Sequence, residues 1–86
     1  MTLSEAYPNP FNPSTNIEFT LADNGPASLK MYNVIGQEVA TLFAGVAEAG
    51  RIYQATFNAA NLPSGLYLAR LESGKMNLVR KLTLVK

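Results

Sequence analysis

The sequence has 86 residues, of which 48% are apolar and 15% charged, and its net charge is +1. This length fits one domain, and the charge balance excludes a strongly basic nucleic-acid-binding domain and an acidic disordered tail. The chain has no cysteine and no histidine, which excludes disulfides, Cys- or His-dependent nucleophilic catalysis and the usual zinc and copper sites.

The charged side chains are unevenly distributed. Residues 1–49 carry five carboxylates and one lysine, whereas residues 50–86 carry six basic side chains and one glutamate. Two differently charged sets of strand surfaces would account for this distribution. The sharper alternative is a basic C-terminal strand that meets an anionic partner.

No apolar run approaches the roughly 20 residues of a transmembrane helix, so no membrane span is predicted. The first residues lack the basic patch and apolar block of a signal peptide. We interpret Met1 and Thr2 as a start placed before an excised domain of residues 3–86. If this domain acts outside the cell, a longer chain must carry its export signal.

The segment from Tyr7 to Thr15 contains three prolines and two asparagines. Each proline fixes its φ near about −65° and lacks an N–H, so the segment can be neither helix nor central strand. Asn9 and Asn12 are expected to bond nearby backbone and close compact turns. Tyr7 and Phe11 are expected to pack into the core. We therefore predict an ordered loop of fixed shape.

Beyond this loop, apolar and polar residues alternate with a period of two, which is typical of strands with one buried face. Strands are predicted over residues 15–21, 27–33, 38–43, 51–57, 66–72 and 76–85, with a short one near residues 3–7. Turns or loops are predicted over residues 23–26, 44–49, 58–65 and 73–75.

This spacing of strands predicts an all-β fold. We expect an immunoglobulin-like antiparallel β-sandwich of about seven strands. The chain lacks the cysteine and tryptophan hallmarks of antibody domains, so only the general shape is predicted. Pro63 and Gly65 are expected to form a turn from which Tyr67 enters the core.

The acidic side chains give no support for an enzyme. Glu18, Glu38 and Glu72 are predicted at outward positions or ends of strands, whereas a glycosidase needs two facing carboxylates in a cleft. Asp23 has too few acidic neighbours for a calcium site. No glycine-rich phosphate loop occurs, and basic and aromatic residues are too sparse for nucleic-acid binding. No cofactor is predicted.

Three motifs follow one another along the chain, at residues 7–15, 32–39 and 62–67, and the last is followed by the basic end at residues 81–86. Together they closely resemble the type A C-terminal sorting domain of the type IX (Por) secretion system of the Bacteroidota. The resemblance covers residues 3–86 and rests on the order, spacing and position of the motifs.

The resemblance implies an immunoglobulin-like sandwich that is an address rather than an enzyme. A covalently joined N-terminal cargo protein would reach the periplasm and then cross the outer membrane through the type IX translocon, with the help of shuttle proteins. A sortase-like surface protease would cut upstream of Leu3. The cargo would be secreted or attached to the cell surface, commonly on anionic lipopolysaccharide.

Carried onto this chain, the resemblance places the sorting signal in a proline–asparagine loop, a turn with the strand that follows it, and the terminal strand. These residues are Pro8, Asn9, Pro10, Asn12 and Pro13, then Pro63, Gly65 and Tyr67, then Lys81, Leu82, Leu84, Val85 and Lys86. Thr83 departs from the apolar terminal pair of many members.

The terminal strand could offer an edge to which a partner adds a strand, with Lys81 and Lys86 steering the encounter. It could equally serve only to complete the sandwich. The alternative function is a passive structural or carbohydrate-binding module beside a catalytic domain. A carbohydrate face needs exposed aromatic rings in a row, and Tyr32 and Tyr53 are the only candidates.

Overall fold

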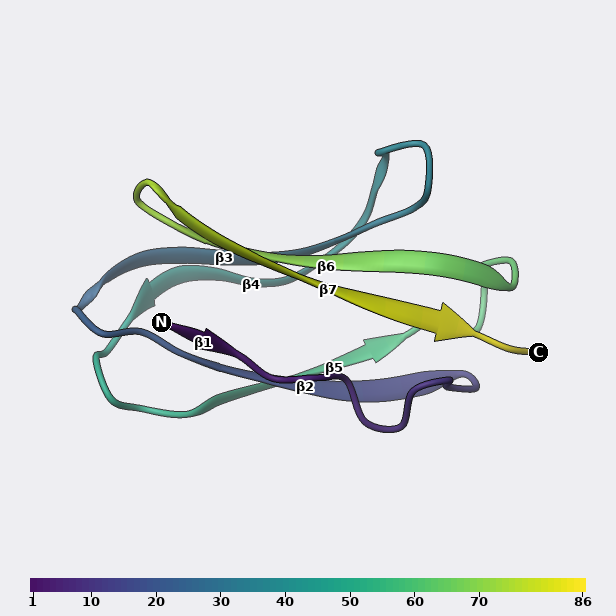
Figure 1. Cartoon of the computed structure of the whole chain (residues 1–86), viewed down its shortest axis with the longest axis horizontal. Helices are drawn as coiled ribbons and strands as arrows, with labels where there is room; N and C mark the ends of the chain where they lie inside the picture. The colour runs from purple at the N-terminus through teal and green to yellow at the C-terminus, as the bar shows by residue number, and fades with distance from the viewer.

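The computed structural model describes the whole chain, Met1 to Lys86, as two antiparallel β-sheets packed face to face (Figure 1). The first sheet has the strand order β1-β2-β5 and the second the order β4-β3-β6-β7. The prediction of an all-β sandwich of about seven strands is confirmed. The strands are β1 (Thr2–Leu3), β2 (Ser14–Thr20), β3 (Gly25–Tyr32), β4 (Glu38–Ala47), β5 (Tyr53–Asn58), β6 (Gly65–Ser73) and β7 (Met76–Leu84). The structure contains no helix that is long and apolar enough to cross a membrane.

Burial alternates along the strands as the sequence predicts. In β2, Ile17 and Phe19 are buried while Glu18 between them is exposed. In β6, Tyr67, Ala69 and Leu71 face inward. The inward side chains of both sheets form one core of 17 buried residues. Full burial of each large apolar side chain contributes roughly 1.5–3 kcal/mol, which is what holds two otherwise separate sheets together.

Aromatic rings pack in two groups within and beside this core. In one group, Tyr53 stacks on Phe19 with 5.2 Å between ring centroids, and Phe43 meets both rings edge-on. In the other, Phe57 lies 5.8 Å from Phe11 and 6.1 Å from Tyr67. The second group joins the loop before β2 to strands of both sheets.

Strand β4 is longer than predicted. Residues 44–49 were expected to form a loop, but the strand continues to Ala47 because β3 also starts early, at Gly25, and its first residues pair with residues 44–47. Ladder hydrogen bonds come from the backbone and tolerate small residues of low strand propensity, and Ala47 is fully buried. The turn expected at residues 23–26 is correspondingly confined to residues 22–24.

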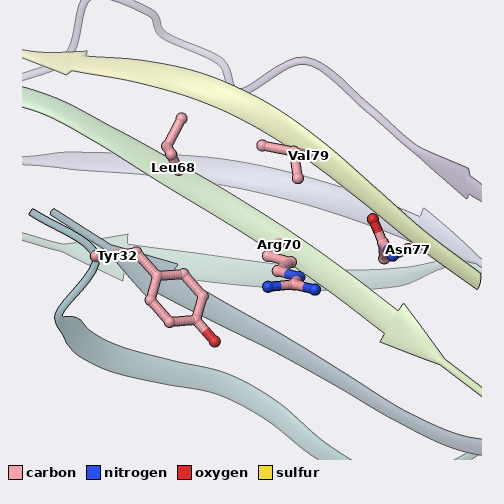
Figure 2. A pocket seen from close by; sticks show the side chains of 6 residues that line it. Tyr32, Leu68, Arg70, Asn77 and Val79 are labelled. Carbon is pink, nitrogen blue, oxygen red and sulfur yellow. The ribbon is translucent and has the colours of Figure 1, made fainter. Parts of the chain in front are cut away.

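The outer face of the four-stranded sheet bears a shallow hollow of about 270 Å³ (Figure 2). Tyr32, Arg70 and Val79 line it from three adjacent strands. Tyr32 and Tyr53, the two candidates for a carbohydrate face, lie on different sheets, and Tyr53 packs against Phe19. The chain therefore does not present these rings in a row.

Candidate functional site

The segments that carry the three motifs meet at one end of the sandwich, at the right of Figure 1. The Pro–Asn loop (residues 7–13) leads into β2, residues 33–37 join β3 to β4, residues 59–64 lead into β6, and β7 ends there. We call residues 7–13, 33–37, 59–67 and 81–86 the motif end. The sequence alone does not show that these segments lie at the same end, because the strand topology decides which loops share an end.

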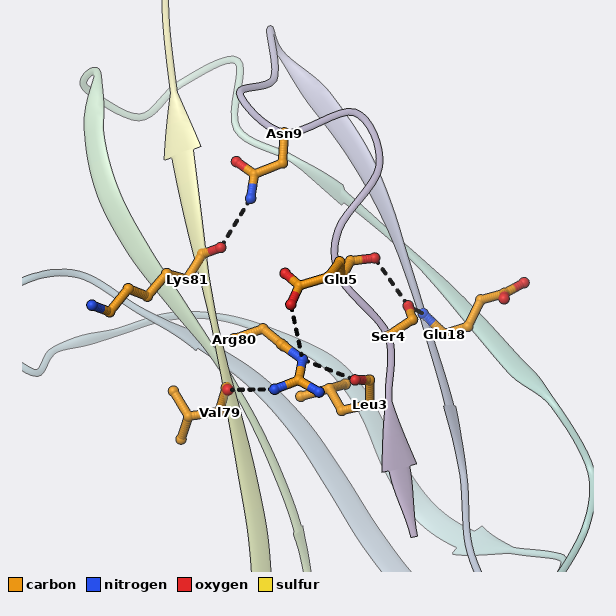
Figure 3. A network of polar contacts seen from close by, with 8 residues as sticks. All are labelled: Leu3, Ser4, Glu5, Asn9, Glu18, Val79, Arg80 and Lys81. Atoms are coloured by element: carbon orange, nitrogen blue, oxygen red, sulfur yellow. Dashed lines mark hydrogen bonds and ion pairs between the residues drawn. The ribbon is translucent and has the colours of Figure 1, made fainter.

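Asn9 joins the Pro–Asn loop to the terminal strand. Its Nδ2 donates to the carbonyl oxygen of Lys81 at 3.0 Å (Figure 3), and its Oδ1 accepts from the backbone N–H of Thr83 at 3.0 Å. The side-chain amide thus offers β7 a donor and an acceptor, as the backbone of a neighbouring strand would. The expectation that Asn9 bonds the backbone of residues near it in the sequence is wrong. Its partners belong to β7, which the fold brings beside the loop.

Phe11 continues this pairing through its own backbone. Its N–H donates to the carbonyl of Thr83 at 2.9 Å, and its carbonyl accepts from the N–H of Val85 at 3.0 Å. Its side chain is 2% exposed and packs against Phe57. On its other side, β7 pairs with β6 along its whole length. The open strand edge expected for a partner is therefore already occupied between Lys81 and Val85.

Three further contacts fix the shape of the loop. The hydroxyl of Thr15, a buried polar side chain with 1% exposure, donates to the carbonyl of Pro8 at 2.7 Å. Tyr7 and Asn16 exchange backbone hydrogen bonds of 2.9 and 3.0 Å, and the N–H of Ala59 donates to the carbonyl of Pro13 at 2.8 Å. The predicted ordered loop thus obtains its order from bonds to β2 and to the segment after β5.

Two expectations for this loop are wrong. Tyr7 is 81% exposed rather than buried. It pairs with Asn16, an outward residue of β2, and cross-strand partners share a face of the sheet. The side chain of Asn12 is exposed and closes no turn by a hydrogen bond, unlike the amide of Asn9.

The turn before β6 packs as predicted. Tyr67 is 3% exposed, and its hydroxyl donates to the carbonyl of Pro63 at 2.6 Å. This bond ties the turn to the core through a single side chain. In the β6–β7 ladder, Gly65 lies opposite Leu84 and Tyr67 opposite Leu82. The second and third parts of the expected sorting signal are therefore direct neighbours.

The terminal residues divide between core and surface. Leu82 and Leu84 are each 1% exposed, whereas Val85 is 50% exposed. Lys86 lies against the turn before β6: its N–H donates to Ser64 Oγ at 3.2 Å and its Nζ to the carbonyl of Ala60 at 2.9 Å. Most other expected signal residues are exposed, namely Pro8, Asn9, Pro10, Asn12, Pro13, Pro63, Gly65 and Lys81.

The motif end is basic. It contains Lys81 and Lys86 and no aspartate or glutamate. Glu38, at the start of β4 just after residue 37, lies 3.3 Å from the Lys30 ammonium. A hydrogen bond from the Thr41 hydroxyl, and then the Lys30 ammonium, hold the pKa of Glu38 below its ordinary value. Glu38 thus has cationic and hydroxyl partners of its own outside the motif end.

Arg80 is a residue that the sequence reasoning missed. Its Nε donates to the carbonyl of Leu3 at 2.9 Å and lies 3.7 Å from Glu5 Oε1, so it joins β7 to the N-terminal segment (Figure 3). The period-two pattern places Arg80 on the inward side of the strand with Leu82 and Leu84. An arginine at an inward strand position was the available signal. Thr83 carried no such signal, because it acts through its backbone.

A known protein family matches almost the whole chain. A family model described as a secretion system C-terminal sorting domain matches residues 5–85. No curated protein matches the chain. The matched range contains all of the motif end except Lys86.

Proposed function

Because the chain belongs to the family of type IX secretion-system C-terminal sorting domains, we propose that it directs a larger cargo protein through the outer-membrane translocon for cleavage and surface attachment. The domain is a C-terminal sorting signal of type IX secretion. The cargo is a protein joined to its N-terminus, and it is secreted or placed at the cell surface.

One observation supports the proposal: the motif segments, far apart in sequence, lie at one end of the sandwich, and most of the expected signal residues are exposed there. The Pro–Asn loop occupies the edge of β7 from Lys81 to Val85. A partner would therefore bind the loop and the strand together as a folded surface, rather than add a strand to a bare edge.

We propose that the residues of the expected signal divide into two roles. The exposed ones contact the translocon or its shuttle proteins, and Lys81 and Lys86 favour an anionic surface there. Tyr67, Leu82 and Leu84 are buried, so they position that surface without touching a partner.

The contacts of β1 support a proposal for the place of cleavage. Thr2 and Leu3 pair with Thr20 and Phe19 in the first sheet, and Arg80 holds the carbonyl of Leu3. A protease needs its substrate as a free extended segment. We therefore propose that the sortase-like surface protease cuts upstream of Thr2, in the connection to the cargo. In this reaction the domain is part of the substrate and not the enzyme.

The test is a secretion assay. A reporter preceded by a signal peptide is fused to residues 1–86 and expressed in a host with a working type IX system. We expect surface or extracellular reporter, and periplasmic retention in a translocon mutant. Deletion of residues 82–86 should also cause retention, but it removes core residues, so a surface variant is needed beside it.

That variant is Lys81→Glu with Lys86→Glu, and its matched control is Lys75→Glu in the β6–β7 turn at the opposite end. We expect the double variant to be retained and the control to be exported. Export that is independent of the translocon would overturn the proposed function, and normal export of the double variant would overturn the proposed contact surface.

A further inference from the structure

The loop between β3 and β4, residues 33–37, displays two large aliphatic side chains at its tip. Val34 is 69% exposed and Ile35 is 74% exposed. Single exposed aliphatic residues are common on protein surfaces. Here two neighbours stand together, within the motif end, on a loop whose conformation is tightly fixed.

Asn33 fixes this loop. Its Oδ1 accepts from the N–H groups of Ile35 at 3.1 Å and Gln37 at 3.0 Å, and its Nδ2 donates to Gln37 Oε1 at 2.9 Å. Its backbone carbonyl accepts from the N–H of Gly36 at 3.0 Å, and its N–H donates to the carbonyl of Gln37 at 3.0 Å. A rigid loop loses little conformational entropy when a partner binds it.

The turn itself does not require Val34 or Ile35. Both have negative φ, while Gly36 has a φ of 84°. Turns with asparagine first and glycine fourth accept most residues at the two central positions, where polar residues are common. The hydrogen bonds that fix the loop come from the side chains of Asn33 and Gln37 and from the backbone. The local fold therefore gives no reason for two exposed aliphatic residues.

The loop borders two hollows. Val34 and Ile35 line one, of about 300 Å³, together with Pro63 from the turn before β6 and Leu66 at the start of that strand. The other is the hollow on the outer sheet face, which Gly36 and Tyr32 line; Tyr32 is seen in Figure 2. We call the exposed tip beside these two depressions the ridge, and a partner's surface could enclose it by entering them.

One side of the ridge is basic, and the carboxylate of Glu38, which follows the loop, is paired with Lys30. Ser64, in the first hollow, accepts from the N–H of Lys86, and the motif end contains no acidic side chain. In the second hollow the guanidinium of Arg70 is paired with Glu72 at 3.0 Å. A partner that encloses the ridge therefore meets uncompensated positive charge on the side of the terminal lysines.

We infer that Val34 and Ile35 form an anchor that enters an apolar pocket, edged by carboxylates, on a protein partner. This inference rests on the proposed function, because the partner is the one that reads the motif end. A lipid surface fits the shape less well: it cannot follow the hollows, and the ridge offers two aliphatic side chains without the aromatic residues of membrane-surface anchors.

The experiment compares Ile35→Asp with Ile52→Asp in the secreted reporter fusion. Ile52 is 65% exposed and, like Ile35, lies outside the strands. Aspartate suits the turn at residue 35 and opposes an acidic rim. We expect export to fall about tenfold for Ile35→Asp, as for the loss of one buried aliphatic group, and to be unchanged for Ile52→Asp. Circular dichroism and thermal melting of each purified domain verify the fold.

Each outcome is decisive. If the wild-type fusion is not exported, the proposed function is wrong. Normal export of folded Ile35→Asp, or equal losses in both variants, overturns the anchor while the proposed function stands. If the wild-type domain floats with phosphatidylcholine–phosphatidylglycerol vesicles and Ile35→Asp does not, the anchor binds a membrane and not a protein. A wild-type dimer in light scattering that Ile35→Asp abolishes would replace it by a second copy.

Discussion

Asn9 and Thr83 are joined by a hydrogen bond of 3.0 Å although 74 positions separate them in the sequence. With the bond from Asn9 to the Lys81 carbonyl, this contact makes the Pro–Asn loop a substitute for an eighth strand beside β7. Exposed strand edges promote aggregation, and covering them is a common protection. The loop therefore serves the solubility of the domain as well as its shape.

Asn9→Asp should destabilise the domain, whereas Asn12→Asp should not. The aspartate keeps an acceptor for Thr83 but places a carboxylate beside the Lys81 carbonyl, and each net hydrogen bond contributes roughly 0.5–1.5 kcal/mol. We expect a loss of about 1 kcal/mol in urea unfolding for Asn9→Asp and less than about 0.5 kcal/mol for Asn12→Asp. Equal effects would contradict the pairing of Asn9 with β7.

Phe11→Ala should be the most damaging change in the Pro–Asn loop. Removal of a buried phenylalanine typically costs about 3–5 kcal/mol, because transfer and cavity terms add. Tyr7→Ala, which truncates the exposed aromatic residue of the same loop, should change the free energy of unfolding by less than about 0.5 kcal/mol. Thermal or urea unfolding measures both, and a large effect of Tyr7→Ala would indicate that Tyr7 packs in solution.

Tyr67→Phe tests the bond that ties the turn before β6 to the core. Loss of the hydroxyl leaves the Pro63 carbonyl without this donor, so we expect a cost of about 0.5–1.5 kcal/mol. Tyr32→Phe is the control, since its hydroxyl makes no hydrogen bond within the chain. Faster amide hydrogen exchange in residues 60–65 of Tyr67→Phe would place the effect in the turn, and unchanged exchange would argue against it.

Gly36→Ala should destabilise the β3–β4 loop. Gly36 has a φ of 84°, a conformation that costs other residues roughly 1–2 kcal/mol. An added Cβ would meet no atom within 4 Å, so the cost comes from backbone conformation alone. Gly25→Ala, where φ is not positive and space is also open, should be neutral or slightly stabilising. Urea unfolding of the pair separates conformation from crowding.

Thr41→Val should raise the pKa of Glu38 toward its ordinary value of 4.5. The Thr41 hydrogen bond is the main reason that the folded-state pKa is depressed, and Lys30 is the second. A depressed pKa stabilises the fold above pH 4.5, and this contribution is lost as the pH falls through the folded-state value. NMR titration of the Glu38 carboxyl measures the change. Salt that abolished the shift while Thr41→Val left it intact would assign it to Lys30 instead.

Local alternation made most of the strands predictable. Ile17 and Phe19 alternate with polar neighbours, and the turn expected over residues 73–75 is present, although Ser73 still pairs with Met76 and only Gly74 and Lys75 lie between the strands. Strand β4 was underestimated because pairing with β3 depends on backbone groups that every residue has. The partners of Asn9 were unpredictable for the same reason: they are backbone atoms at residues 81 and 83.

The sequence motifs named the residues of the candidate site but did not predict how these residues are arranged. The resemblance named the Pro–Asn loop, the turn before β6 and the terminal strand, but only the fold places them in contact and separates exposed Lys81 from buried Leu82. The structural roles of Asn33 and Arg80 could have been predicted from the sequence. An asparagine three positions before a glycine indicates a turn, and an arginine on the inward side of a strand needs a polar partner.

Arg80, Asn9 and Phe11 connect the first stretch of the chain to its last strand. During synthesis from the N-terminus, the backbone carbonyl of Leu3 and the backbone N–H and carbonyl of Phe11 lack these partners until residues 80–85 have been added. A product that stops short of Val85 cannot close the motif end. The folded end thus distinguishes a chain that contains residues 80–85 from one that stops before them, so a receptor that binds only this closed surface would reject chains interrupted upstream.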